Sequence, residues 1–323
     1  MYGYEWTEEY GIFRLTIDAR MQKEIRPVFH EELDFFGMDA YWDYPKDTDA
    51  PLLWAEGIRR YVMNGVCVAE AQGGGFYTKP VINRLTEERL QLHPIDTDRL
   101  YEVNKALMLS LEQKVITFIQ EQHEHYASEG FAFVCAFSGG KDSLVLLDLC
   151  AKALAPEDFY VVFSNTGMEL SDTLKAVEEA KKRWPQLRFE EAKCHMSATE
   201  SWAEFGPPAS RLRWCCSVHK SVPTILLIKE MFGEQAKAVV FDGVRAEESL
   251  RRSKYTEVGE GVKNAMQINC HAILKWSSAE VFVYSFKNGV MLNKAYKYGI
   301  SAWYAQWPQN GKIHLSPISI PMK

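Results

Sequence analysis

Short apolar runs punctuate the middle of the chain, and each one is followed by a polar or glycine-containing turn and then by an amphipathic segment. The runs are rich in Val, Phe and Ala, as expected for buried strands of a parallel sheet. The segments between them repeat apolar residues at helical spacing. This pattern predicts an α/β fold, a doubly wound and mainly parallel sheet with helices on both faces. The predicted strands are 131–137, 159–164, 187–192 and 237–242, and the predicted helices are 142–154, 171–184, 220–232 and 277–287.

Residues 1–95 follow a different pattern. They are rich in aromatic residues and contain short alternating segments at 12–17 and 61–69, separated by proline- and glycine-containing turns. This predicts a smaller β-rich or α+β N-terminal module, in which no residue indicates a function. A connecting helix is predicted at 96–127, apolar on one face, before a nucleotide-binding domain at 128–299.

The bulk composition limits the possible function classes. The chain has 323 residues, of which 47% are hydrophobic and 25% charged, which predicts a globular protein of about two domains. The net charge of −6 does not favour non-specific nucleic-acid binding. No apolar stretch is long enough to span a membrane and the first residues do not resemble a signal peptide, so we expect a cytoplasmic protein. An odd number of cysteines, seven, does not suggest a disulfide framework. The sequence leaves open whether the chain forms a homo-oligomer.

The most informative segment is the loop from Ser138 to Ser143, which follows the first predicted strand and begins a helix. Gly139 and Gly140 allow backbone N–H groups to approach an anion, and the helix start adds its own N–H groups and the positive end of its dipole. Lys141 supplies a positive charge. Asp142 would repel phosphate unless it binds Mg²⁺ or caps the helix. The loop therefore predicts a nucleotide phosphate site, the alternative being an ordinary strand–turn–helix corner.

Further candidate residues follow the other predicted strands, at the edge where ligands bind in such sheets. Asn165, Thr166, Gly167 and Glu169 follow the second strand and could contact the adenosine half of a nucleotide, although a helix cap at Ser171 explains the same pattern.

A basic segment precedes the fourth predicted strand, and another follows it. Arg213 and Lys220 lie in a run of basic side chains that suggests an anion pocket, the alternative being a solvated basic face. Arg245 follows the fourth strand, and its guanidinium is suited to phosphate or sulfate. Pairing with Glu247 or Glu248 is the alternative, which we expect for Arg252.

Together these segments resemble the phosphoadenosine phosphosulfate (PAPS) reductase family and its PP-loop ATP pyrophosphatase relatives, over about Phe131 to Gly299. The resemblance implies the adenine nucleotide α-hydrolase fold, and ATP or an adenylyl sulfate as substrate. It implies that Lys141, Asp142, Lys220 and Arg245 are catalytic, with Asp142 binding Mg²⁺. The residues that it implies bind the nucleotide are Ser138, Gly139, Gly140, Ser143, Asn165, Thr166, Gly167, Glu169, Arg213, Gly243 and Ser249.

The chain departs from the family pattern at its cysteines. Family members with a [4Fe-4S] cluster combine a doublet such as Cys215 and Cys216 with a later Cys-x-x-Cys, but no cysteine follows Cys270. The Glu-Cys-Gly motif of thiol-using reductases is also absent from the sequence. Residues 300–323 do not match the family, and a displaced reading frame through Ser301 to Lys312 can spell a cysteine-rich segment. The hypothesis is a frameshifted, truncated tail, which sequencing of the gene would test.

The intact loop favours ATP pyrophosphatase or adenylation chemistry linked to sulfur metabolism or sulfur transfer, with an unknown sulfur or adenylate acceptor. A true PAPS or adenosine phosphosulfate (APS) reductase and a non-catalytic nucleotide-binding protein are the alternatives. A weaker reading is a partner subunit in DNA phosphorothioation, where the acceptor would be nucleic acid.

Overall fold

The computed structural model describes residues 2–17, 24–57, 59–75, 78–206, 214–260, 266–291 and 293–299. The predicted contacts of Arg213 and the hypothesised frameshifted tail at 300–323 lie outside these residues. The described chain forms two compact units. One unit contains residues up to 111 together with 245–253 and 275–299, and the other contains 112–244 and 254–274.

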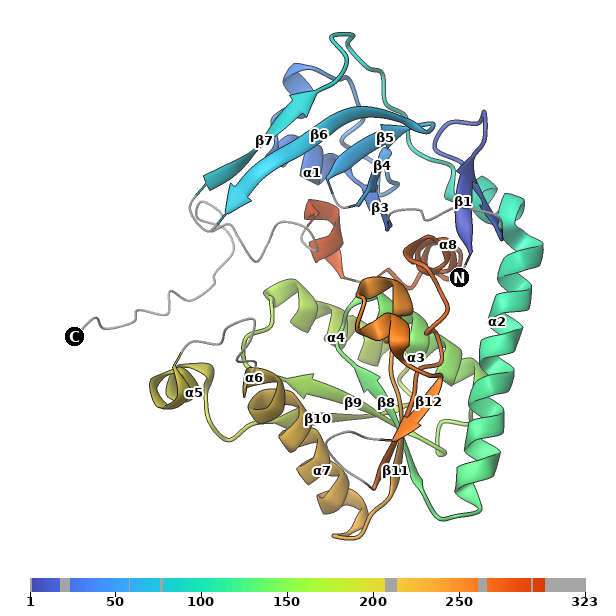
Figure 1. Ribbon diagram of the computed structural model, residues 1–323, viewed down its shortest axis with the longest axis vertical. Helices are drawn as coiled ribbons and strands as arrows, with labels where there is room; N and C mark the ends of the chain where they lie inside the picture. The colour runs from blue at the N-terminus through green and yellow to red at the C-terminus, as the bar shows by residue number, and fades with distance from the viewer. Residues whose placement is uncertain are drawn as a thin grey trace. The chain divides into compact units, whose positions relative to one another are not determined.

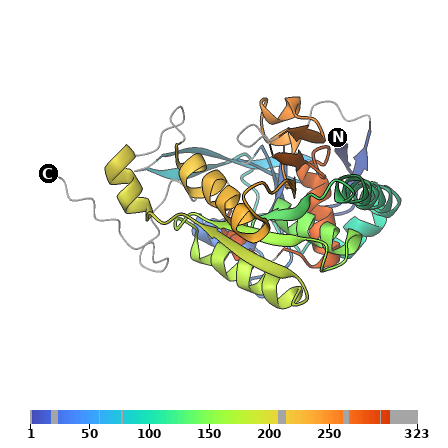
Figure 2. The same ribbon diagram turned by 90° about the horizontal axis from the view of Figure 1, so that it is seen from below.

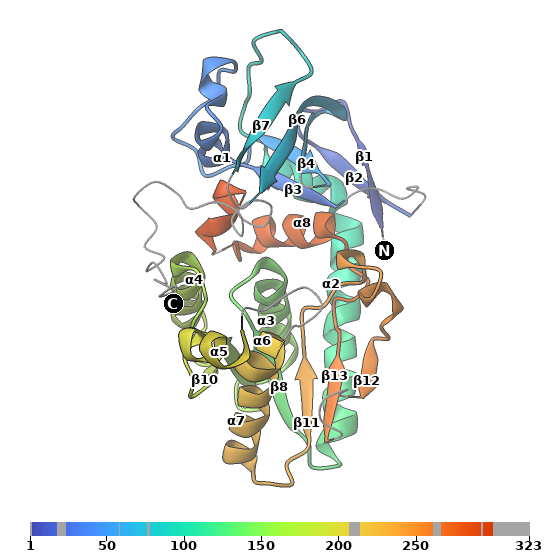
Figure 3. The same cartoon turned by 60° about the vertical axis from the view of Figure 1, so that its left-hand side comes forward.

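The second unit contains a six-stranded sheet in the order β10-β9-β8-β11-β13-β12 (Figures 1 and 3). Every neighbouring pair is parallel except β12 with β13. The chain moves from β8 to β9 and β10 on one side and then returns to place β11 on the other side of β8. The strands are β8 (Ala132–Phe137), β9 (Tyr160–Asn165), β10 (Arg188–Lys193), β11 (Ala238–Phe241), β12 (Val258–Glu260) and β13 (Gln267–Cys270).

Helices cover both faces of this sheet, and Figure 2 shows α4 and α7 on opposite sides of it. On the α7 face, Ile228 packs with Val134, Val162 and Val240. The predicted doubly wound α/β fold is confirmed, and the predicted strands and helices agree with the structure to within about two residues at each end. The helices of this unit are α3 (Lys141–Ala153), α4 (Ser171–Arg183), α5 (Ala198–Phe205), α6 (Trp214–Cys216), the π-helix η2 (Ser217–Ser221) and α7 (Val222–Phe232).

The first unit is built on a five-stranded antiparallel sheet in the order β3-β4-β5-β6-β7, beside the two-stranded β1-β2 pair. The predicted β-rich character of the N-terminal module is therefore confirmed. The segment 61–69, read as one alternating run, is instead a hairpin that turns at Asn64 and Gly65, both with positive φ, as hairpin turns require. The strands are β1 (Gly3–Trp6), β2 (Phe13–Thr16), β3 (Ile25–Val28), β4 (Leu53–Glu56), β5 (Arg60–Met63), β6 (Val66–Gly75) and β7 (Thr78–Arg84).

Segments from the C-terminal part of the chain complete this first unit. Helix α8 packs on β3, where the Ile25 N–H donates to Ser278 Oγ at 3.0 Å, and Phe286 packs edge-on against Trp54. The unit boundaries therefore cut across the predicted domains, because 275–299 buries its apolar face against the N-terminal strands. The helices are α1 (His30–Phe35), η1 (Met38–Ala40), η3 (Ala246–Glu248), η4 (Arg252–Lys254), α8 (Ser278–Asn288) and η5 (Lys294–Tyr298), with η4 reaching one residue into the other unit.

The predicted connecting helix is α2 (Thr97–Ala127), which contributes residues to both units. Among the described residues, no helix combines the length and the apolar character that a membrane span requires.

Candidate functional site

The loop from Ser138 to Ser143 lies at the carboxyl end of β8, the central strand at which the order of the sheet reverses. In open α/β sheets, ligands bind outside the carboxyl ends of the strands at this reversal, which here lies between β8 and β11. Helix α3 begins at Lys141 directly after Gly140, its N-cap residue. The first N–H groups of a helix have no acceptor within the helix, so they point toward this edge with the positive end of the dipole. The fold thus places an anion-binding geometry at the edge where ligands bind.

Gly139 is a position where the fold requires glycine. Its φ is +69°, and a Cβ atom there would lie 3.1 Å from Thr173 Cγ2 and 3.2 Å from the Thr173 carbonyl oxygen. Thr173 belongs to the first turn of α4, so the loop packs closely against the segment that follows β9. The structure therefore brings together two of the segments that the sequence indicated.

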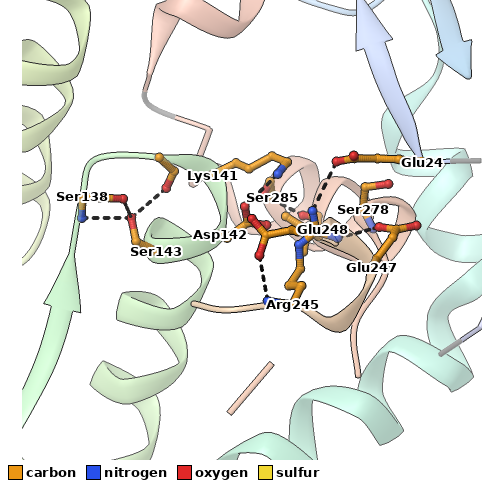
Figure 4. Close-up of polar contacts among 12 residues, drawn as sticks. Glu24, Ser138, Lys141, Asp142, Ser143, Arg245, Glu247, Glu248, Ser278 and Ser285 are labelled. Atoms are coloured by element: carbon orange, nitrogen blue, oxygen red, sulfur yellow. Dashed lines mark hydrogen bonds and ion pairs between the residues drawn. The ribbon is translucent and has the colours of Figure 1, made fainter. Parts of the chain in front are cut away.

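Ser143 braces the loop from inside. Its hydroxyl donates to the Gly140 carbonyl at 3.0 Å and lies 3.2 Å from the Ser138 N–H and 3.0 Å from Ser138 Oγ (Figure 4). Ser143 is buried, as expected for a structural brace. This side chain holds the loop in shape through its own contacts, whereas the sequence indicated it as a phosphate ligand.

Lys141 and Asp142 form an ion pair, with Nζ 2.7 Å from Asp142 Oδ2. Both side chains are largely buried. A single carboxylate at the loop suits Mg²⁺, which proteins usually hold through one or two carboxylates together with substrate phosphates. The residues present therefore fit a Mg²⁺ ion carried in by a nucleotide.

The turn after β9 is organised around Glu169. Its carboxylate accepts hydrogen bonds from the Thr166 N–H and hydroxyl and from the Met168 N–H. The Gly167 N–H donates to Asn165 Oδ1 at 2.8 Å, and Gly167 has a φ of +73°. Glu169 therefore holds this turn in shape through hydrogen bonds to residues 166 and 168.

Cys215 and Cys216 lie in the short helix α6, just before the π-helix η2. Among the described residues, no group of three or more His, Cys, Asp or Glu side chains has metal-binding geometry. The cysteine doublet by itself does not fit a four-thiolate cluster, so we derive no step through one. Lys220 lies on η2 and is exposed. The neighbouring His219 is buried, with Nε2 2.9 Å from Ser201 Oγ.

Gly243 follows β11 and touches the start of α3. A Cβ there would lie 3.0 Å from the Asp142 carbonyl carbon and 3.1 Å from the Ser143 nitrogen. This close approach of two backbones needs a residue without a side chain. Gly243, which the family resemblance indicated, is thus part of the same edge as the loop from Ser138 to Ser143.

Arg245 and Ser249 belong to the first unit, and their side chains contact residues of that unit. The Arg245 guanidinium is fully buried, with Nη1 2.6 Å from Glu247 Oε2 and Nη2 3.3 Å from Glu24 Oε1 (Figure 4). Its backbone N–H donates to Glu248 at 2.9 Å. Ser249 Oγ accepts the Arg252 N–H. The carboxylate pairing considered as the alternative is therefore present at Arg245, and Arg252 pairs with Glu248 as expected.

Glu280 on α8 is a buried carboxyl in this unit, and it gives a prediction. Burial, reinforced by the nearby Glu247, raises its pKa to about 7 from an ordinary value of 4.5, although the Ser277 N–H donates to it. Below pH 4.5 the group is protonated in both the folded and the unfolded chain. As pH rises from 4.5 to 7, the folded state holds its proton longer, so stability falls, by about 3 kcal/mol in total.

Glu280→Gln removes this titration. We expect the variant to gain stability over the unchanged chain between pH 4.5 and 7 and to keep that gain above pH 7. Urea unfolding at several pH values measures the difference. If the difference in the free energy of unfolding between Glu280→Gln and the unchanged chain does not change with pH, the prediction is contradicted.

The sequence missed two residues at the edge of the second unit, Asp242 and His271. Asp242 directly precedes Gly243, so its place after a predicted strand was a usable signal. His271 follows β13, which was not predicted because 267–270 is short and half polar.

Comparison with known proteins adds a family match. Residues 132–302 match the model of the phosphoadenosine phosphosulfate reductase domain. Two uncharacterized proteins of Methanocaldococcus jannaschii are 33% and 32% identical over 62% and 61% of the chain. The alignments span only 40% and 46% of those relatives, so the chain covers less than half of their length.

A protein named adenosine 5'-phosphosulfate reductase, from Halalkalibacterium halodurans, is 29% identical over 57% of the chain and 74% of that relative. Among solved structures, PAPS reductase from Candida auris is 19% identical with a TM-score of 0.43, covering 59% of this chain and 90% of the other. NAD synthetase from Campylobacter jejuni is 14% identical with a TM-score of 0.42, covering 61% and 78%. The fold itself is defined by the strand order described above.

Proposed function

Because the chain belongs to the phosphoadenosine phosphosulfate reductase domain family, we propose that it is an enzyme that binds an adenine nucleotide through the loop from Ser138 to Ser143. The observation that carries this proposal is the position of that loop. It combines two glycines, a helix start and Lys141 at the reversal point of a parallel sheet. The ligand is ATP or an adenylyl sulfate.

In this proposal the loop holds the phosphate chain. The backbone N–H groups of Gly139 and Gly140 and the first turn of α3 approach the phosphate oxygens, and Lys141 turns from Asp142 to the phosphates. Asp142 is then available for the Mg²⁺ that accompanies ATP, which screens phosphate charge. Asn165, Thr166 and Gly167 lie after the neighbouring strand, where the nucleoside would extend.

We propose ATP cleavage between the α- and β-phosphates as the reaction, with transfer of the adenylyl group to an acceptor linked to sulfur metabolism or sulfur transfer. An intact phosphate loop favours this chemistry. Lys220 and Arg213 are the proposed additional cations for the charge that develops in the transition state. The same role for Arg245 stays a prediction, and in the first unit its guanidinium is paired with Glu247 and Glu24.

Reduction of an adenylyl sulfate is the second candidate, favoured by the relatives named adenosine 5'-phosphosulfate reductase. A bound nucleotide without turnover would indicate a non-catalytic binding protein.

The test offers the purified chain ATP with Mg²⁺, APS and PAPS in separate reactions, with a dithiol reductant supplied in the two adenylyl sulfate reactions. Pyrophosphate and AMP products are measured with ATP, and sulfite with either adenylyl sulfate. Pyrophosphate release that is lost in Lys141→Ala supports the proposal. Sulfite release would replace it with the reductase, and failure to bind any of these nucleotides would overturn it.

A further inference from the structure

Asp242 and His271 form a hydrogen-bonded pair at the carboxyl ends of two neighbouring parallel strands. Asp242 directly follows β11 and His271 directly follows β13. His271 Nδ1 lies 2.6 Å from Asp242 Oδ1. The other constraint on the imidazole is Tyr255, whose ring stacks on it at 5.4 Å between centroids and 26° between planes. The ring is therefore held in one orientation.

The partners of Asp242 determine which imidazole nitrogen carries the proton. Asp242 Oδ1 also accepts the Val244 N–H at 3.2 Å, so it acts as an acceptor toward both neighbours. Nδ1 of His271 must then be the donor, as an ionised carboxylate can only accept. This leaves Nε2 as the nitrogen that can meet a ligand. A neutral ring with its proton on Nδ1 has no hydrogen on Nε2, so donation from Nε2 requires the imidazolium, in which both nitrogens carry a proton.

The pair lies beside the phosphate loop within the same unit. Gly243 is the residue after Asp242, and a Cβ placed on it would lie 3.0–3.1 Å from the backbone of Asp142 and Ser143. Strand β11 pairs with β8, so Asp242 and Ser138 leave neighbouring strands at the reversal point of the sheet. His271 comes from the next strand along. This arrangement gives the edge a hydrogen-bond donor on the side of the loop opposite to Thr166 and Glu169.

We propose that His271, oriented by Asp242 and protonated on both ring nitrogens in the complex, donates a hydrogen bond from Nε2 to a phosphate oxygen of the ligand held by the loop from Ser138 to Ser143. His271 is then a binding residue, and Asp242 is a positioning residue that acts through it. This inference rests on the proposed function, because it assumes a polyphosphate at the loop. It adds a contact that comes from neither of the basic segments.

Two substitutions of His271 separate ligand binding from a purely structural role. Asparagine places an amide N–H near the position of Nδ1, so His271→Asn keeps the bond to Asp242 and removes Nε2. Glutamine reaches farther and places its amide near Nε2, so His271→Gln loses the bond to Asp242. If His271 has only a structural role, the Gln variant should have the lower Tm. If His271 contacts phosphate, the Asn variant should bind the polyphosphate ligand more weakly.

The experiment measures the Kd of the full chain for ATP with Mg²⁺ and for tripolyphosphate by calorimetry, together with the Tm of each variant. We expect His271→Asn to keep its Tm within about 2 °C and to raise both Kd values about tenfold, since hydrogen bonds to charged groups are among the stronger ones. We expect Asp242→Asn to raise them as well. The matched control is His123→Asn, because His123 packs on Phe133 at the amino end of β8, away from the loop. Its Kd values should stay unchanged.

The outcomes separate this inference from the proposed function. If the unchanged chain binds both probes and His271→Asn binds them with the same Kd values, the inference about His271 is overturned and the proposed function is not. Binding of tripolyphosphate without ATP would overturn the adenine nucleotide assignment, and the His271→Asn Kd for tripolyphosphate would still decide the inference. If the unchanged chain binds neither probe, both are overturned.

Discussion

Replacing Gly139 with valine is expected to raise the Kd for ATP with Mg²⁺ by about 10- to 100-fold. A β-branched residue at a φ of +69° is strained by about 1–3 kcal/mol. Its side chain would also press against the first turn of α4 at Thr173. The loop can relieve the backbone strain and the clash only by changing its conformation. Its N–H groups then no longer point toward one ligand, so the affinity for ATP falls. Calorimetric titration of the folded variant measures the change.

Gly130→Val is the control for this substitution. Gly130 has a φ of +76°, and no atom lies within 4 Å of a Cβ placed there. It precedes β8, so it lies at the edge of the sheet opposite to the loop. The control should show a similar conformational strain as a lower Tm and an unchanged Kd. Equal Kd values for Gly139→Val and the unchanged chain would show that the loop does not bind the nucleotide.

Replacing Glu32 with alanine is expected to destabilise the first unit by about 3–5 kcal/mol. Glu32 is fully buried and makes a two-pronged ion pair with Arg26, at 2.6 and 2.7 Å, and it accepts the Tyr61 hydroxyl at 2.8 Å. Removing one member of a buried pair leaves the other charge without compensation. Urea unfolding followed by the fluorescence of buried Trp42 and Trp54 measures the loss.

A surface pair and a double substitution serve as controls. Glu102→Ala breaks an exposed ion pair with Lys105 in the same unit and should change stability by less than about 1 kcal/mol. Arg26→Met combined with Glu32→Leu removes both charges and should recover much of the stability. If Glu32→Ala unfolds like the Glu102 variant, the buried pair does not hold the unit together.

The same site explains why the C-terminal part of the domain belongs to the N-terminal unit. Gly299 lies against the Glu32 carboxylate, where a Cβ would be 2.6 Å from its carboxyl carbon. Lys297 pairs with Glu31 and Asp49. Segments separated by more than 200 positions in the sequence thus contact each other within the first unit.

Much of the second unit could be predicted from the sequence. Its strands are short apolar runs that end in polar turns, and its helices have one apolar face, so local pattern and tertiary burial agree. The loop from Ser138 to Ser143 could be located equally well, because its glycine pair lies between a buried strand and a helix, and its phosphate-binding role stays a prediction. The N-terminal hairpin at Asn64 and Gly65 was missed, since alternation alone does not show where a strand turns back.

The sequence by itself determined four strands of the second unit, the helices between them and the loop at Ser138 to Ser143, because each depends on neighbouring residues. Tertiary structure decided which polar groups meet. It paired Arg245 with Glu24, placed Asp242 against His271, and made Ser143 a brace for its own loop. These contacts depend on strand order and on chain segments far apart in sequence, and a charged or hydroxyl side chain does not reveal its partner until the fold supplies one.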